Sequence, residues 1–194
     1  MKKLFLSLFI LSSLYAWAKP SDVIGFGSYA KWLMTIEAVE KSYGDKWVNV
    51  ENIRKNTNLK PVYRLPLNDP YVVCADYIFS SGVLAKGIVY YYLPASSILI
   101  DMVRMYGPYD VYLEEPWSGS YIKPSVIKRW IWKFPSTVLV LNDNIAEATF
   151  MKDHQNRLNN TSYTDGDVKL DFPTGIFVEY ISFAYPNNTN WDLN

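Results

Sequence analysis

The sequence predicts an α+β fold in which helices pack on an antiparallel β-sheet. Two segments carry apolar residues at helical spacing, and each is followed by β-rich segments separated by turn residues. This helix–hairpin order occurs twice and then ends in one more β-rich segment, which predicts a tandem duplication of a helix–hairpin unit plus a C-terminal β-hairpin. Apolar residues make up 49% of the 194 residues, enough to bury a core and to exclude a disordered chain.

The first 18 residues have the pattern of a bacterial signal peptide. Lys2 and Lys3 precede an apolar run over 4–11, and Ala16-Trp17-Ala18 matches an A-x-A cleavage signal. The alternative, a membrane anchor, is disfavoured because the whole stretch from residue 4 to residue 18 is about fifteen residues and a spanning helix needs roughly 20. We therefore predict a mature chain that begins at Lys19 and lies in the periplasm or outside the cell.

The first half of the mature chain is predicted to contain a helix and then a hairpin. The helix covers residues 29–43, is capped by Ser28 and ends at Gly44, a residue suited to a left-handed C-terminal cap. Its apolar positions are Tyr29, Trp32, Leu33, Ile36, Val39 and Tyr43. A second short helix is expected over 49–56 and a short strand over 62–65. The hairpin pairs strands 71–79 and 83–93 around the turn 80–82.

The second half is predicted to follow the same order. A helix capped by Ser96 or Ser97 runs to Tyr106 and is stopped by Gly107-Pro108. A loop is expected over 113–124, followed by an alternating strand over 126–134. A second hairpin joins strands 138–141 and 145–151 around Asn142-Asp143-Asn144.

The two halves also have nearly constant spacing, which supports the duplication; the alternative is that helix–hairpin order is common in α+β domains. Tyr43-Gly44 and Tyr106-Gly107 are 63 residues apart, and the predicted hairpin turns at 81–82 and 143–144 are 62 apart. The predicted organisation is a signal peptide (1–18), a first half (19–93), a second half (94–152), and a polar linker with a C-terminal hairpin (153–194). Residues 19–194 are expected to form one compact unit.

A short series of motifs in the second half resembles the SmpA/OmlA envelope family. A helix ends in Tyr106-Gly107-Pro108, and a variable loop leads to the tryptophan strand Lys128-Arg129-Trp130-Ile131-Trp132 and then to a turn at 142–144. The doubled arrangement is similar to the tandem β-lactamase-inhibitor-protein family. This resemblance covers roughly 31–151 and implies a small exported module that binds other proteins. The chain lacks the lipid-bearing cysteine of the first family and the disulfides of the second.

Composition excludes several classes of function. The single cysteine, Cys74, cannot form an internal disulfide framework, and one cysteine with one histidine cannot build a His/Cys-rich zinc site. Lys+Arg and Asp+Glu both number 19, so the chain lacks the positive charge of a nucleic-acid binder. We expect no cofactor and no bound metal. Cys74 lies in an apolar, strand-like run, which favours a buried thiol over an exposed nucleophile.

Catalytic patterns are weak in this sequence. His154, the only histidine, lies in a polar stretch and is interpreted as a solvated loop residue, because no Gly-x-Ser-x-Gly motif suggests a triad around it. Glu114 and Glu115 lie beside Trp117, but adjacent residues on a strand point to opposite faces and make a poor acid/base pair. Carboxylates at 165, 167 and 171 hint at calcium without the order of an EF-hand loop.

The aromatic content, 16% of all residues, is the strongest compositional feature. It favours either a core filled with large rings or an exposed binding face, since Tyr and Trp dominate interface hot spots. The loop around Trp117 and Tyr121 is the best single candidate for a contact site. The candidate binding residues are Trp117, Tyr121, Tyr90, Tyr92, Trp130 and Trp132.

These observations predict an exported, non-catalytic protein-binding module, such as an inhibitor, an immunity-type protein or a component of an envelope complex. The partner is expected to be another protein, with no nucleic acid and no membrane span after signal removal. The alternative is a carbohydrate or peptidoglycan binder that stacks sugars on exposed aromatic rings.

Overall fold

The computed structural model describes residues 19–47, 51–52, 62–66, 69–117, 125–144 and 175–183. Its elements, in chain order, are β1 (Gly25–Phe26), β2 (Ala30–Lys31), α2 (Ile36–Tyr43), the 3-10 helix η2 (Gly44–Trp47), β3 (Glu51–Asn52), β4 (Val62–Pro66), β5 (Val72–Ser80), β6 (Val83–Tyr91), α3 (Ala95–Tyr106), β7 (Val111–Trp117), β8 (Ser125–Lys133), β9 (Thr137–Asp143) and β10 (Ile176–Ser182).

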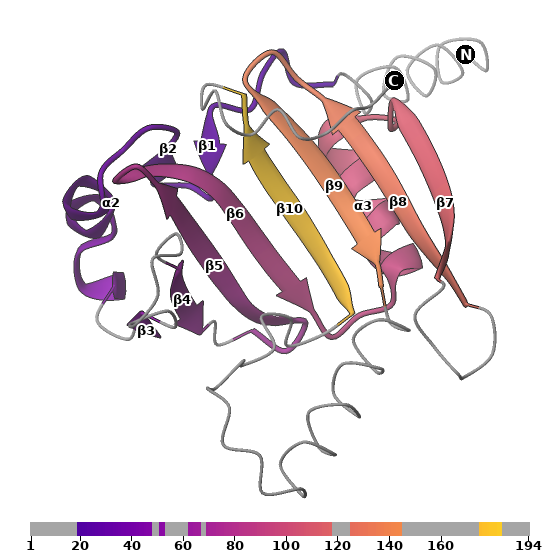
Figure 1. Cartoon of the computed structure of the whole chain (residues 1–194), viewed down its shortest axis with the longest axis horizontal. Helices are drawn as coiled ribbons and strands as arrows, with labels where there is room; N and C mark the ends of the chain where they lie inside the picture. The colour runs from indigo at the N-terminus through magenta and orange to yellow at the C-terminus, as the bar shows by residue number, and fades with distance from the viewer. Residues whose placement is uncertain are drawn as a thin grey trace, which may run out of the picture.

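One antiparallel sheet dominates the described part of the chain. Its eight strands follow the order β3-β4-β5-β6-β10-β9-β8-β7, and β1 and β2 form a separate two-stranded sheet (Figure 1). The predicted α+β class, with helices packed on a sheet, is therefore wrong, and the fold is β-rich. The physical reason is that segments expected to be helix or loop are extended: residues 29–35 contain β2 and a turn, and residues 111–117 form β7.

The C-terminal strand β10 lies in the middle of the sheet. It pairs with β6 through Phe177–Ile181 and with β9 through Ile176–Ser182. The sequence pattern predicts that the C-terminal hairpin pairs a strand over 168–172 with one over 176–185. Both partners of β10 are other strands, so this hairpin is not observed as an independent unit, and residues 168–172 lie outside the described residues. Six of the seven residues of β10 are buried, so this strand joins the two sets of strands through the core.

The predicted turn at 142–144 is also wrong, because Asn142 and Asp143 belong to β9. The hairpin of the second half is instead closed at Pro135-Ser136, between β8 and β9. The spacing of 62 residues between the two predicted hairpin turns therefore no longer supports the predicted duplication. The helices differ as well, since α2 has 8 residues and α3 has 12.

Helix α2 begins later than its apolar pattern predicted. Thr35 is its N-cap and accepts a hydrogen bond from the Ala38 amide at 3.3 Å, in place of the expected Ser28. Leu33, at φ 66°, breaks the helical run before this cap. The predicted end is confirmed, because Gly44 has φ 55° and its N–H donates to the Glu40 carbonyl.

Helix α3 and the β5–β6 hairpin agree with the sequence prediction. The helix ends at Tyr106, and Gly107, at φ 77°, closes it with an N–H bond to the Val103 carbonyl. Its start differs, since Pro94 is the N-cap and no side chain caps the helix. The hairpin turns through Ser81 and Gly82, both with positive φ, as the primed turns of tight hairpins require.

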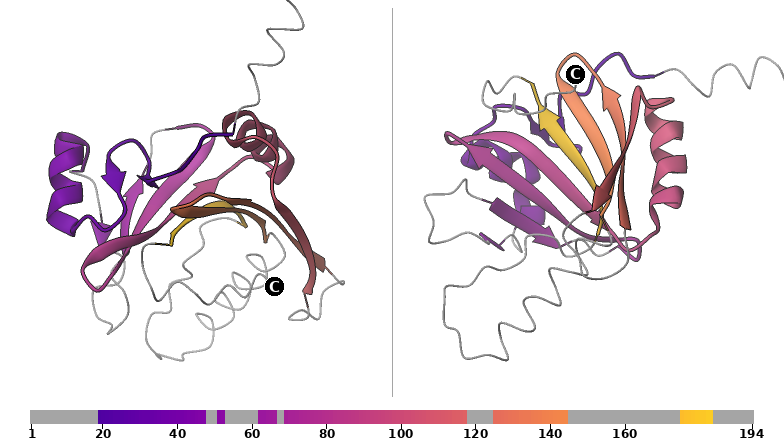
Figure 2. Two further views of the ribbon diagram at one scale, coloured as in Figure 1. Left: turned by 90° about the horizontal axis from the view of Figure 1, so that it is seen from above. Right: turned by 45° about the vertical axis from the view of Figure 1, so that its right-hand side comes forward.

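The sheet buries apolar residues on both faces. The face on which α2 and α3 lie, here called the helix-side face, carries Ile176, Val178 and Tyr180 of β10. The two larger core clusters, which include residues of β1, β2 and the two helices, pack against this face. The opposite face carries Phe177, Glu179 and Ile181, with two smaller apolar clusters. Figure 2 shows the curvature of the sheet and α3 lying on one side, near β8 and β9.

Phe26 anchors the small β1–β2 sheet to the large one. Its ring lies over Gly87, where an added Cβ would come within 2.1 Å of the ring. Gly87 is paired with Tyr77 on β5 and Tyr180 on β10, and both tyrosine rings contact Phe26, with centroids 4.8 and 5.2 Å away. A glycine in the middle of β6 thus makes room for an aromatic ring between two flanking rings.

Gly87→Ala is expected to destabilise the fold by about 2 kcal/mol, because the new methyl group overpacks the space that the Phe26 ring fills. The free energy of unfolding in urea measures the loss. In a Phe26→Ala background the same change should cost less than about 1 kcal/mol. An equal cost in both backgrounds would show that the ring does not occupy this space.

Candidate functional site at the edge strand β7

Strand β7 forms one edge of the large sheet. All seven of its residues pair with β8, and none of the residues that the structure describes pairs with its outer side. The strand at the other edge, β3, has only two residues. An edge strand leaves half of its backbone N–H and C=O groups unpaired, so β7 offers a ready template for another strand.

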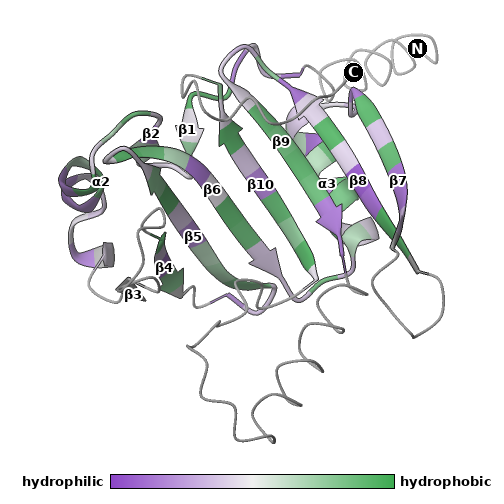
Figure 3. Cartoon of the chain, in the orientation of Figure 1, coloured by the Kyte–Doolittle hydropathy of each residue, from purple (hydrophilic) through white to green (hydrophobic). Residues whose placement is uncertain are grey.

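The side chains of β7 alternate between the two faces. Val111 and Leu113 pack into the apolar cluster of the opposite face, whereas Tyr112 and Glu114 belong to the helix-side face. Figure 3 shows the resulting mixture of hydrophobic and hydrophilic residues along this strand. This period of two is what the sequence shows from Val111 to Glu114, a stretch that we predicted in part to be a loop.

Asp110 fixes the position where β7 begins. Its Oδ2 accepts hydrogen bonds from the Lys19 Nζ and from the Lys133 amide, both at 2.6 Å. Burial by itself would raise the pKa of Asp110, but these two bonds outweigh it and hold the pKa below its ordinary value. The start of β7 is therefore tied both to the end of β8 and to residue 19.

Four aromatic rings, here called the edge aromatic cluster, come from the segment after α3 and from the strands β7 and β8: Tyr109, Tyr112, Trp130 and Trp132. Ring centroids are 5.4 Å apart for Tyr112–Trp130, 6.4 Å for Tyr109–Tyr112 and 6.2 Å for Tyr109–Trp132. Trp132 is fully buried and donates its Nε1–H to the Gly107 carbonyl at 2.8 Å. Tyr109 and Tyr112 are 42% and 40% exposed, so the cluster runs from the core to the surface.

A carboxylate belongs to the exposed end of this cluster. The hydroxyl of Tyr112 donates a hydrogen bond to Oε1 of Glu114. That bond raises the pKa of Tyr112 to about 12. Register places Lys128 between Glu114 on β7 and Asp143 on β9, so two carboxylates flank a single lysine in this row.

Among the side chains that the structure describes, Trp130 and Trp132 are the predicted binding residues that it brings together. Tyr90 is 1% exposed and lies in a cluster of the opposite face. Tyr92, 67% exposed, lies beyond the end of β6 in the other half of the sheet. Trp117 is the last residue of β7, and Tyr121 lies outside the described residues, as do His154 and the carboxylates at 165, 167 and 171.

Sequence reasoning missed Tyr109 and Tyr112, the two exposed members of the cluster. The alternation Val111-Tyr112-Leu113-Glu114 could have predicted a strand with Tyr112 on the outer row. No periodic pattern predicts the exposure of Tyr109, because this residue lies between α3 and β7 and its position depends on how Gly107 ends α3.

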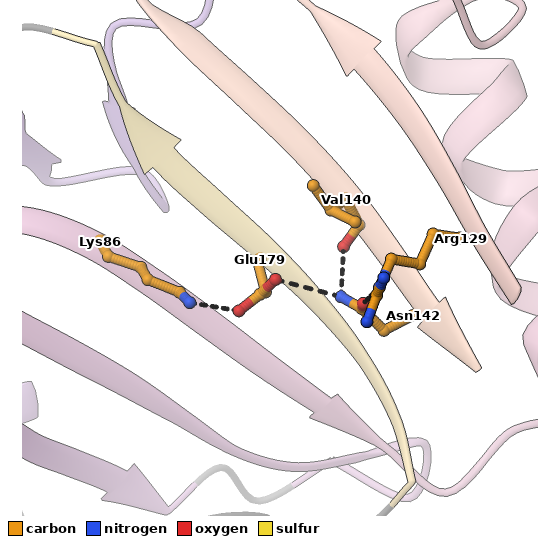
Figure 4. Close-up of polar contacts among 5 residues, drawn as sticks. All are labelled: Lys86, Arg129, Val140, Asn142 and Glu179. Carbon is orange, nitrogen blue, oxygen red and sulfur yellow. Dashed lines mark hydrogen bonds and ion pairs between the residues drawn. The ribbon is translucent and has the colours of Figure 1, made fainter. Parts of the chain in front are cut away.

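A polar network crosses the opposite face (Figure 4). Glu179 forms an ion pair with Lys86 and accepts a hydrogen bond from Asn142 Nδ2 at 3.3 Å. Asn142 Oδ1 accepts from Arg129 Nε at 3.2 Å, and Arg129 Nη1 bonds Oε2 of Glu115 at 2.5 Å. The chain of contacts joins β6, β10, β9, β8 and β7. Glu114 and Glu115 therefore point to opposite faces and meet different partners.

A second buried ion pair lies on the same face, between β4 and β5. Arg64 Nε and Nη2 bond the two oxygens of Asp76 at 2.7 and 2.6 Å. The Asp76 side chain is 3% exposed and that of Arg64 is 24% exposed. Burial by itself would lower the pKa of Arg64, but Asp76 outweighs burial and raises that pKa above its ordinary value.

The described residues contain no group of three or more His, Cys, Asp or Glu side chains that could hold a metal ion. Within the same residues, no helix has the length and apolar character needed to cross a membrane. Comparisons with protein-family models, with curated proteins and with solved structures find no match to this chain.

Asp76→Asn is expected to destabilise the fold by roughly 3 kcal/mol, because the partly buried Arg64 guanidinium loses the charge of the buried carboxylate that pairs with it. Urea unfolding measures the change. Asp101→Asn is a matched control, since its contact with Arg104 is long (3.4 Å) and exposed; it should cost less than about 0.5 kcal/mol. Similar losses in the two variants would contradict a special role for the buried pair.

Cys74 is a free, buried thiol with 4% exposure. Burial raises its pKa to about 11, so the folded protein at pH 8 holds about a hundredfold less thiolate than an ordinary cysteine. We expect a disulfide reagent such as Ellman's to label the native protein at least about a hundredfold more slowly than the urea-unfolded protein. Rapid stoichiometric labelling of the native protein at pH 8 would show an accessible thiol.

Proposed function

We propose that this chain is a non-catalytic protein-binding module that takes up an extended segment of a partner protein as an added strand beside β7. The observation that carries the proposal is a seven-residue edge strand, open on its outer side within the described residues, with the half-exposed Tyr112 on it and the half-exposed Tyr109 just before it. In strand addition, backbone hydrogen bonds supply affinity and alternate side chains supply specificity.

The charge of the edge favours a foreign strand over a second copy of the chain. Asp110, Glu114 and Glu115 lie in or beside β7, which contains no basic residue. Like charges placed opposite each other destabilise strand pairing, and Pro116 removes a backbone donor. These features resist self-pairing while leaving the segment 111–115 open to a partner of different charge.

The geometry of the rings favours a peptide over a sugar, the alternative raised by the sequence. The planes of Tyr112 and Trp130 are tilted by 36°, and those of Tyr109 and Tyr112 by 50°. They do not form one flat platform for a pyranose ring. Export and a likeness to the SmpA/OmlA family are sequence predictions that agree with an extracytoplasmic protein-binding role.

A random nine-residue peptide library, panned against the purified protein, tests the proposal. The selected peptides should slow amide hydrogen exchange at alternate residues of β7 by about tenfold or more, since each outward N–H gains a partner. Tyr112→Ser should weaken their binding about tenfold, the effect of losing an interface anchor.

Tyr92→Ser is the matched control, because it removes another exposed tyrosine from the far half of the sheet; it should leave binding within about twofold. Peptides that bind without changing exchange in β7, or that respond to Tyr92→Ser alone, would contradict the assignment. Quenching of tryptophan fluorescence by cell-wall oligosaccharides, with no peptide selected, would support the glycan alternative instead.

A further inference from the structure

The exposed end of the edge aromatic cluster has the parts of a cation-binding subsite. Two tyrosine rings, Tyr109 and Tyr112, lie with centroids 6.4 Å apart and planes 50° from parallel. The carboxylate of Glu114 is held against the Tyr112 hydroxyl. All three side chains are exposed, so they can be reached from solvent. We infer that Tyr109, Tyr112 and Glu114 bind one lysine or arginine side chain of the added strand.

Glu114 differs from the other carboxylates of this segment. Asp110 pairs with Lys19, and Glu115 pairs with Arg129. Among the described residues, Glu114 takes part in no ion pair, and its one hydrogen-bond partner is the tyrosine hydroxyl. Its cross-strand neighbour Lys128 lies equally opposite Asp143. The row Glu114–Lys128–Asp143 thus carries a net negative charge at the open edge.

The tyrosine rings and the Glu114 carboxylate both attract a positively charged group. An ammonium or guanidinium group within about 6 Å of a tyrosine ring centre is attracted to the face of the ring. A carboxylate adds a charge-assisted hydrogen bond to the same group. An acidic side chain would meet repulsion from Glu114, and an apolar one would leave that carboxylate without a charged partner.

Strand addition brings a side chain of the partner to this position. Residues directly opposite on neighbouring strands have Cβ atoms about 4.5–5.5 Å apart and share a face. A residue opposite Tyr112 or Glu114 therefore lies beside the rings and the carboxylate. Its two neighbours in the added strand face the other way, towards Val111 and Leu113, which are partly buried apolar residues. The ligand is thus an extended segment with one basic residue between two apolar ones.

This inference rests on the proposed function, because the basic side chain is delivered by the added strand. Three synthetic nine-residue peptides test it. They share alternating valine and threonine residues and differ only at the central position, which is lysine, methionine or glutamate. Dissociation constants come from tryptophan fluorescence, and hydrogen exchange reports on the amides of β7.

We expect the lysine peptide to bind at least tenfold more tightly than the methionine peptide, and the glutamate peptide to bind most weakly. Glu114→Gln should reduce the lysine-to-methionine ratio to about threefold or less. Tyr112→Phe keeps the ring and should preserve most of the preference, whereas Tyr112→Leu should reduce it. Glu40→Gln, an exposed carboxylate on α2, is the matched control and should leave the ratio unchanged.

The outcomes separate the two proposals. Equal binding of all three peptides, with protection of the β7 amides, would overturn the cation subsite and leave strand addition standing. A lysine preference that persists in both Glu114→Gln and Tyr112→Leu would show that the charge is recognised elsewhere, and would also overturn it. Failure of every peptide to protect β7 would refute strand addition and the subsite together.

Discussion

The fold depends on the insertion of β10 between β6 and β9. Without β10, these two strands would be the open inner edges of two separate sets of antiparallel strands. β10 pairs with both and buries six of its seven residues. Its Tyr180 side chain contributes to both helix-side core clusters. One strand therefore supplies the missing backbone partners and joins two partial cores into one.

Burial on both faces makes the register of β10 critical. A slip by one residue would exchange Val178, which packs in the helix-side core, with Glu179, which meets Lys86 and Asn142 on the opposite face. The polar network penalises such a slip, because it would leave the partly buried Lys86 and the buried Asn142 without Glu179. Buried charges contribute little net stability, but here their positions favour one register of β10 over others that apolar packing alone would allow.

Local features of the sequence predicted part of this structure. Helical spacing and a terminal glycine located α3, and β-rich runs around Ser81-Gly82 located the β5–β6 hairpin. The position of β10 could not be predicted, because strand order depends on which edges remain unpaired after the local hairpins form. Nor could periodicity divide the aromatic residues between core and surface. Tyr90 and Tyr92 lie two residues apart in an apolar run, yet one is buried and the other lies beyond the strand.

The same reasoning explains why the candidate site lies at β7. Because β10 pairs with both β6 and β9, the strands at the edges of the sheet are β3 and β7. The strand β3 is only two residues long. β7 is long enough to accept another strand, and its backbone is already extended by seven pairings with β8. Trp132, fixed by its bond to Gly107, supports Tyr109, while Trp130 supports Tyr112. The exposed rings are therefore ordered before any partner arrives, which reduces the entropy lost on binding.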